Sequence, residues 1–188
     1  LYMTSMSAAG LVAGCAANPV TGESQLMLMS ESQEIGIDKK NAPHQFSSDY
    51  GICQDPVVAR YVEEVGQKIG ANTHRAQMPY SFRCVNATYV NAYAFPGGSI
   101  AATRGILVSL ESEAELAALI GHELGHVNAR HTAQQMSKGT LVQAVIGGIT
   151  SYAGTKGGAY GEIASQLGML GAGALLASYS RDNEREAD

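Results

Sequence analysis

The sequence predicts a single domain of the α+β class that is mostly α-helical. Two stretches, residues 55–70 and 112–127, place apolar residues at helical spacing behind a residue suited to an N-cap. Between them lie three short segments rich in aromatic and β-branched residues, which favour strands. A chain of 188 residues, 45% hydrophobic and 15% charged, suffices for one sizeable core, and its net charge of −5 disfavours binding to nucleic acid.

Two helices are expected before the strands. Residues 28–46, "LMSESQEIGIDKKNAPHQF", favour a helix that ends at Pro43. In the second helix Asp55 is a suitable N-cap, and Pro56 fits the first helical position. The apolar stripe of this second helix consists of Val58, Tyr61, Val62, Val65 and Ile69.

The strands and a third helix follow. Short strands are expected within residues 80–87, 90–95 and 98–104, the last two separated by a Pro-Gly-Gly turn. The third helix is predicted to start near Ser109 or Ser112, where Ser112 and the glutamate three residues later have the spacing of a capping box. Its core face consists of Leu116, Leu119, Ile120, Leu124 and Val127.

The third helix carries "LIGHELGHVNARH", residues 119–131, with three of the five histidines. An α-helix turns about 100° per residue, so side chains four apart differ by only about 40° around its axis. His122 and His126 can therefore meet one metal ion, and Glu123, about 60° from His126, can reach a water on that metal. His131 points about 140° away from His126, so it is not expected to be a third ligand on this helix.

A catalytic zinc usually has three protein ligands and one open position. Glu184 and Asp188, within the final residues "SRDNEREAD", lie four apart and share a helical face. We expect Glu184 to bind zinc and Asp188 to accept the spare N–H of a ligand histidine. Glu186 is the competing ligand, but it points about 160° away from Glu184, so only one of the two can face the metal. The isolated His44 and His74 are interpreted as surface residues in loops.

Residues 1–15 are uncharged and have the pattern of a signal peptide whose start is missing. They end in Val-Ala-Gly-Cys, the order of a bacterial lipobox in which Cys15 would be lipidated. Residues 16–29 are expected to form a polar tether, and residues 30–188 the domain itself.

Two further cysteines, Cys53 and Cys84, have two interpretations. In an exported protein they could pair, but connectivity cannot be read from a sequence. A free buried thiol at either position fits the sequence nearly as well, and both alternatives stay open.

Two blocks, "NAYAFPGGSIAATRGILVSLESEAELAALIGHELGHVNARH" and "SRDNEREAD", resemble the zinc metallopeptidase family that includes HtpX-like membrane proteases and CAAX prenyl proteases. Within that family the lipobox and tether are most similar to the periplasmic, BepA-like and LoiP-like lipoprotein proteases. The likeness covers about residues 18–188, and HExxH alone would not distinguish the zincin families. It implies a zincin-like (gluzincin) core with a short sheet beside the HExxH helix. The core would be truncated at its C-terminus, because family members continue beyond this point.

The resemblance also implies roles for individual residues. His122, His126 and Glu184 would be the zinc ligands, Glu123 the catalytic base, and Asp188 the carboxylate that holds a ligand histidine. Two glycines of the Pro-Gly-Gly turn would let a substrate backbone approach closely, although a plain tight turn explains them equally well. The implied substrate-binding residues are Asn91, Ala92, Gly97, Gly98 and Ser99.

The expected function is that of a zinc-dependent metalloendopeptidase with one Zn²⁺ per chain. Its expected substrates are unfolded or misassembled envelope proteins. It is expected in the periplasm, anchored to the outer membrane, with the outer-membrane assembly machinery as an expected partner. The alternative is a lipoprotein chaperone or assembly factor with little proteolysis, but an intact Glu123 favours the enzyme. A structural zinc site is disfavoured, since it is normally closed by four ligands.

The Gly-rich residues 139–178 resemble the family's variable insert, which could cover the site as a gate. The uncharged run 163–179 favours a buried or interfacial helix over a membrane span.

Overall fold

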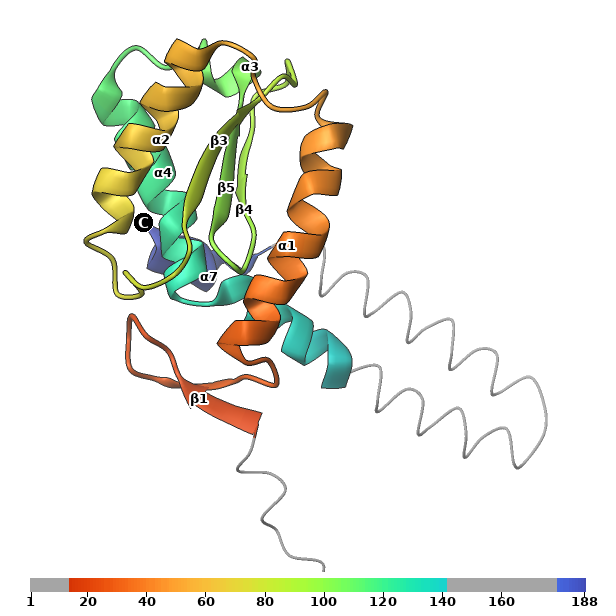
Figure 1. Cartoon of the computed structure of the whole chain (residues 1–188). Coiled ribbons are helices and arrows are strands. Elements are labelled where there is room, and N and C mark those ends of the chain that lie inside the picture. The colour runs from red at the N-terminus through yellow and green to blue at the C-terminus, as the bar shows by residue number, and fades with distance from the viewer. Residues whose placement is uncertain (1–13, 142–178) are drawn as a thin grey trace, which may run out of the picture.

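The computed structural model describes residues 14–141 and 179–188, and these form layers around a small sheet (Figure 1). Helices α2 and α4 pack on one face of the sheet, and α1 packs on the other. The described part of the chain is mostly helical with small sheets, as predicted. The named helices are α1 (Glu31–Ser48), α2 (Pro56–Gly70), α3 (Arg104–Leu107), α4 (Glu113–Asn128) and α7 (Arg181–Ala187). The strands are β1 (Cys15–Ala17), β2 (Ser24–Leu26), β3 (Ser81–Val85), β4 (Ala92–Ala94) and β5 (Ser99–Thr103).

The central sheet has the strand order β3-β5-β4. Strand β5 runs parallel to β3 and antiparallel to β4, so β4 is an edge strand. Because side chains alternate along a strand, Phe82 and Cys84 face α2 and α4, while Val85 faces α1. The ring of Phe82 lies directly over Gly66 of α2, where any Cβ atom would collide with it. This close approach fixes α2 on the sheet.

Helices α2 and α4 begin where the sequence predicts. The Asp55 side chain accepts from the backbone N–H of Val57 at 2.8 Å, which makes it the N-cap of α2. Ser112 caps α4 by accepting from the Glu115 N–H at 3.3 Å. The predicted capping box is only half formed, because the Glu115 carboxylate instead accepts from the backbone of Glu111 at 2.7 Å.

Helix α1 continues through Pro43, and the prediction that it ends there is wrong. Proline removes one helical hydrogen bond, the one to the carbonyl of Lys39, and that residue is exposed to solvent. Packing compensates for the lost bond, since Ala42 and Phe46 on either side of the proline are buried against Val85 and Ala101 of the sheet.

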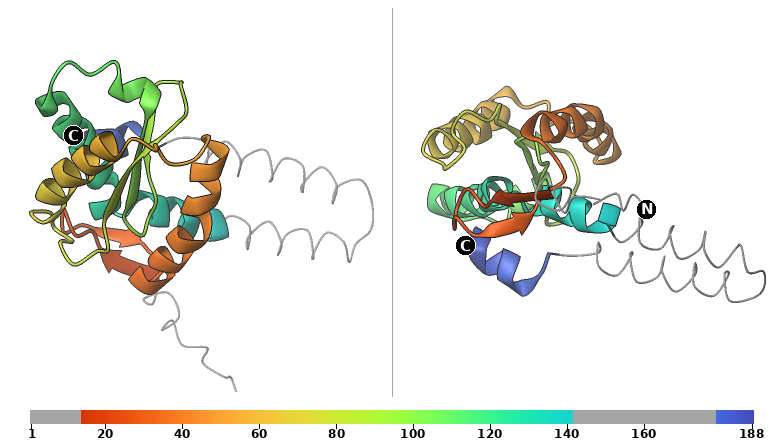
Figure 2. Two further views of the ribbon diagram at one scale, coloured as in Figure 1. Left: turned by 45° about the horizontal axis from the view of Figure 1, so that its top comes forward. Right: turned by 90° about the horizontal axis from the view of Figure 1, so that it is seen from below.

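Residues 16–29, expected to be a tether, include a hairpin that packs on the domain. Strands β1 and β2 pair antiparallel, and the hairpin lies at the end of the molecule where α4 stops (Figure 2). The buried Gln25 side chain donates to the Ala129 carbonyl at 3.3 Å, and Asn18 donates to the carboxylate of Glu186. These side-chain hydrogen bonds, which have no periodic signal in a sequence, attach the hairpin.

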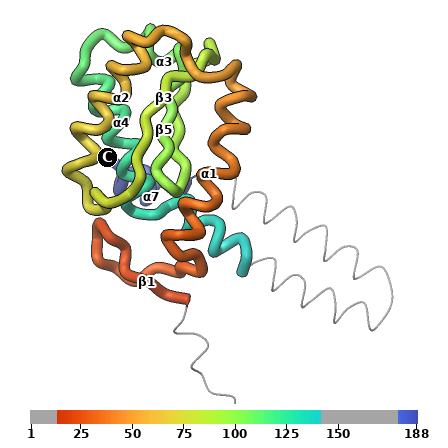
Figure 3. The backbone as a smooth tube through the Cα atoms, in the orientation of Figure 1, coloured from red at the N-terminus to blue at the C-terminus, as the bar shows by residue number. Residues whose placement is uncertain are grey.

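Several predicted features lie mostly outside the described residues. These are the apolar leader before Gly14, the gate at 139–178 and the uncharged run at 163–179. Within residues 14–141 and 179–188, no helix combines the length and the apolar character that crossing a membrane requires. The tube in Figure 3 shows α7 beside α4, although the two are distant in sequence, and their contact creates the site.

Candidate metal centre

The two histidines of HExxH lie side by side on α4, as their spacing predicts. The Nε2 atoms of His122 and His126 are 3.1 Å apart. Glu184, on α7, places its Oε2 atom 3.4 Å from Nε2 of His122 and 3.8 Å from Nε2 of His126. Among the described residues, these three form the one group whose ligand atoms could hold a metal ion, all within 4.8 Å of one another.

The donor set and its spacing fit zinc. Two imidazole nitrogens and one carboxylate oxygen are a known catalytic zinc set, with zinc–ligand distances of about 2.0–2.2 Å. At tetrahedral angles such ligand atoms lie about 3.3–3.5 Å apart. The separations between Glu184 and the two histidines, 3.4 and 3.8 Å, are close to that value without any rearrangement.

Helix α7 reaches this position through local signals and one glycine. Ser180 caps the helix, and its side chain and that of Asn183 form a reciprocal capping box. The helix then crosses α4 at Gly125, where an added Cβ atom would lie 2.4 Å from the carbonyl oxygen of Ala187. Gly125, inside the HExxH motif, therefore permits the approach that brings Glu184 to the histidines.

Each ligand histidine has a partner for its second ring nitrogen. Nδ1 of His122 is 2.8 Å from Oδ1 of Asp188. Since a carboxylate only accepts, Nδ1 carries the proton and Nε2 keeps its lone pair for a metal. This is the contact that the predicted role of Asp188 requires, and the role itself stays a prediction.

His126 is oriented by a pair of residues, the buried His131 and the partly buried Glu186, that the sequence did not reveal. Its Nδ1 is 2.9 Å from Nδ1 of His131, and Nε2 of His131 is 3.1 Å from Oε2 of Glu186. The Glu186 carboxylate accepts from Nε2–H of His131, so Nδ1 of His131 accepts from Nδ1–H of His126. His131 is only 1% exposed. His131 follows the end of α4 and is not in the ligand group, which includes Glu184 and not Glu186.

The protonation of Glu123 and His126 is set mainly by burial. Burial raises the pKa of Glu123 to about 7, the Glu184 carboxylate adds to the rise, and His122 opposes it. Burial, with His131 and His122 nearby, lowers the pKa of His126 to about 4. His126 is therefore neutral at neutral pH, which a metal ligand requires. At the same pH the Glu123 carboxyl group of the metal-free site is partly protonated.

Tyr179 is a site residue that the sequence analysis missed. Its ring stacks on His126, with centroids 4.2 Å apart and planes at 19°. Its hydroxyl is 2.6 Å from that of Thr132. As one of nine tyrosines at the end of an uncharged run, it offered no distinguishing signal.

The histidines set aside as surface residues are exposed. His44 lies on α1 rather than in a loop, and His74 follows α2. Cys15 is exposed on β1, where it pairs with Leu26.

The predicted substrate residues fall into two groups. Ala92 begins the edge strand β4, and Asn91 directly precedes it. In the turn, Gly97 is buried, and a Cβ atom there would meet Asp38 and Ile35 of α1 at 2.5 and 2.8 Å. The backbone that approaches this glycine is thus that of α1. The rest of the turn is also held within the chain. Ser99 binds Asp38 through both its N–H and its hydroxyl, and Gly98, at φ 102°, contacts Tyr80.

Residues 56–188 match the model of "Peptidase family M48". Among curated proteins, the chain is similar to the beta-barrel assembly-enhancing protease of Yersinia pestis, with 29% identity over 90% of this chain and 35% of the relative. It is also similar to two metalloproteases of Escherichia coli. YcaL is 30% identical over 81% of this chain and 54% of the relative. LoiP is 28% identical over 88% of this chain and 60% of the relative. The chain thus spans about a third of the beta-barrel assembly-enhancing proteases it matches.

Proposed function

The chain belongs to peptidase family M48, and we propose that it acts as a zinc-dependent metalloendopeptidase. One observation carries the proposal. The Nε2 atoms of His122 and His126 and a carboxylate oxygen of Glu184 converge at metal-ligand spacing, while Glu123 stands beside them without belonging to the ligand set. Three ligands leave a position for water, whereas a structural zinc site is normally closed by four.

The residues around the ligands have separable tasks. When bound, zinc would lower the pKa of a coordinated water and polarise the scissile carbonyl. Glu123 would accept the proton of the attacking water and deliver it to the leaving nitrogen. Asp188 and His131 would hold the ligand imidazoles in the tautomer that exposes Nε2.

The edge of β4 that pairs with no other strand among the described residues is the proposed substrate-binding surface. The backbone of Asn91 and Phe95 bonds to β5 through Thr103 and Ser99. The direction of backbone hydrogen bonding alternates along a strand. The N–H and C=O groups of Ala92 and Ala94 therefore lie in the plane of the sheet and point away from β5. An extended peptide could pair there as an added strand, a mode in which the backbone is recognised whatever the side chains.

Unfolded or misassembled envelope proteins are the proposed substrates, in the periplasm and with an outer-membrane anchor on Cys15. The names of the relatives from Yersinia pestis and Escherichia coli, which link proteolysis to β-barrel assembly, support this choice. Recognition through backbone groups would favour clients whose strands are unpaired.

The test compares wild type with Glu123→Gln on an unfolded model protein such as reduced casein. Cleavage by wild type that a chelator abolishes and zinc restores is the expected result, with no cleavage by the variant. If both proteins instead suppress client aggregation equally and neither cleaves, the chaperone alternative replaces the peptidase.

A further inference from the structure

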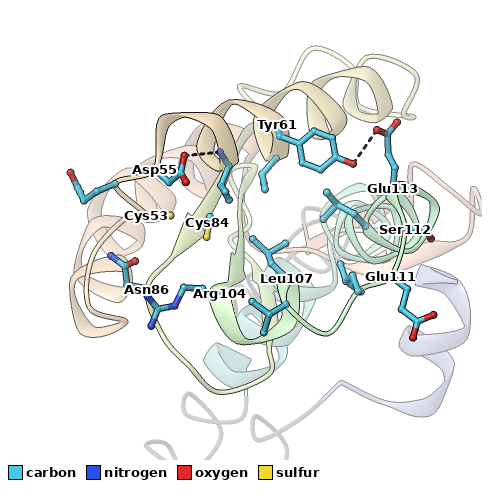
Figure 4. Close-up of a pocket in the computed structure, with 16 residues that line it drawn as sticks. Cys53, Asp55, Tyr61, Cys84, Asn86, Arg104, Leu107, Glu111, Ser112 and Glu113 are labelled. Carbon is cyan, nitrogen blue, oxygen red and sulfur yellow. Dashed lines mark hydrogen bonds between the residues drawn. The ribbon is translucent and has the colours of Figure 1, made fainter.

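A second site lies away from the metal centre. A mostly apolar pocket of about 780 Å³ opens between the starts of α2 and α4 and helix α3 (Figure 4). None of the three metal ligands lines it, but the thiols of Cys53 and Cys84 do. Figure 4 shows the two sulfur atoms close together at one end of the pocket, Cys53 from the segment before α2 and Cys84 from β3.

The backbone brings these cysteines face to face. Ile52 and Val85 form an antiparallel bridge, so the next residue along one segment, Cys53, lies opposite the preceding residue of the other, Cys84. The Cys53 N–H donates to the Cys84 carbonyl at 2.8 Å. Residues directly opposite in an antiparallel pair have Cα atoms about 4.5–5.5 Å apart, within the range of about 4.4–6.8 Å that a disulfide spans.

We propose that Cys53 and Cys84 form a reversible dithiol–disulfide site, oxidised by a small disulfide compound that enters through the pocket. Both cysteines are free thiols in this structure. Bridging them needs no change of register, because the antiparallel pairing already places them opposite each other.

The two cysteines have different parts in the exchange. Cys53 is partly exposed, whereas Cys84 is fully buried. Burial, reinforced by the Cys53 thiol, raises the pKa of Cys84 to about 12. Thiolate is the attacking species, so attack begins at Cys53.

With oxidised glutathione as the reagent, the electrons balance in two exchanges. The Cys53 thiolate attacks one sulfur of glutathione disulfide, forms a mixed disulfide and releases one glutathione thiolate. Cys84 then loses its proton to solvent and attacks the Cys53 sulfur, which releases the second glutathione. The protein loses two S–H bonds and gains one S–S bond, while glutathione disulfide is reduced to two thiols.

The bond would join the start of α2 covalently to β3. It closes a loop of roughly 30 residues, and a loop of that size stabilises a fold enough to raise the melting temperature by about 10 °C in a chain of this length. Zinc binding should be the same in both redox forms, because neither cysteine belongs to the ligand group.

The experiment equilibrates the full chain with glutathione buffers from reducing to oxidising, alkylates the remaining thiols and maps the products by mass spectrometry. We expect two peptides linked through Cys53 and Cys84, with a mass two hydrogen atoms below the sum of the free peptides. The oxidised sample should also have a higher melting temperature. In protein produced without lipidation, Cys15, exposed on β1, is an internal control that should carry glutathione but take no part in the link.

Two variants test the proposed order of attack. Cys84→Ala should stop at a glutathione adduct on Cys53, and Cys53→Ala should leave Cys84 unmodified. The proposal is overturned if wild-type Cys53 and Cys84 both stay free, or if Cys53 carries only glutathione, in a buffer that modifies Cys15. Linkage without a rise in melting temperature would refute the stabilising effect on α2.

Discussion

Gly125 and Ala187 are in direct contact across the crossing of α4 and α7. A Cβ atom at Gly125 would lie 2.4 Å from the Ala187 carbonyl oxygen and 2.6 Å from its Cα atom. Backbone atoms on α7 cannot give way as the end of a flexible side chain can. The glycine inside HExxH thus controls the distance between the two histidines and Glu184, the ligand carried by α7.

Gly125→Ala should therefore weaken zinc binding although it touches no ligand. The added methyl group displaces α7 and moves Glu184 away from the histidines, and we expect zinc affinity to fall by about tenfold or more. Competition with a chromophoric chelator measures it. The matched control is Gly121→Ala one turn earlier on α4, where a Cβ atom meets nothing within 4 Å. If both variants bound zinc like wild type, the α4–α7 contact would not position the ligand.

The pair of His131 and Glu186 should tune the metal site through His126. Removal of such a partner typically lowers metal affinity about 10–100-fold, so His131→Ala and Glu186→Gln should both fall in that range. The control on the same helix is Arg185→Gln, because the Arg185 side chain is 76% exposed. Cobalt substitution gives an independent readout, since a reoriented His126 ring should alter the visible spectrum. An affinity equal to that of the control would assign the pair a purely structural role.

Glu123→Gln should keep zinc and lose catalysis. The amide preserves the shape of the side chain but cannot take a proton from water, so turnover should fall by about 10²–10⁴-fold. Zinc content is measured on the same preparation as casein cleavage. Loss of zinc in this variant would mean that Glu123 is a ligand, contrary to the geometry of the site.

Zinc-free protein should lose stability as pH rises, through Glu123. The pKa of its carboxyl group is raised from 4.5 to about 7 in the folded chain, so the folded state holds this proton more tightly than the unfolded state. Stability from this group is present at acid pH and lost as pH increases through that interval. Glu123→Gln has no proton to lose, so its melting temperature should exceed that of wild type increasingly between pH 5 and pH 8. A constant difference between the two proteins would contradict the raised pKa.

The sequence predicted the parts of the site that rest on local periodicity. His122, His126 and Glu123 follow from helical spacing on α4, and Glu184 with Asp188 from the same spacing on α7. The mutual distance of these two helices could not be predicted, because it depends on a backbone contact at Gly125.

The roles of residues whose partners are remote in sequence could not be predicted either, because they too depend on tertiary contacts. The stacking of Tyr179 and the partnership of His131 with Glu186 require α7 to be docked on α4. Helix α1 passes Pro43 because its flanking residues are buried against the sheet, which local propensity does not register.

Zinc stoichiometry in wild type, Glu184→Ala and Glu186→Ala tests the central claim most directly. We expect one zinc per wild-type chain, marked loss of zinc in Glu184→Ala, and retention with weakened affinity in Glu186→Ala. Retention in Glu184→Ala together with loss in Glu186→Ala would exchange the roles of the two glutamates, and little zinc in wild type would contradict a three-ligand site in this chain.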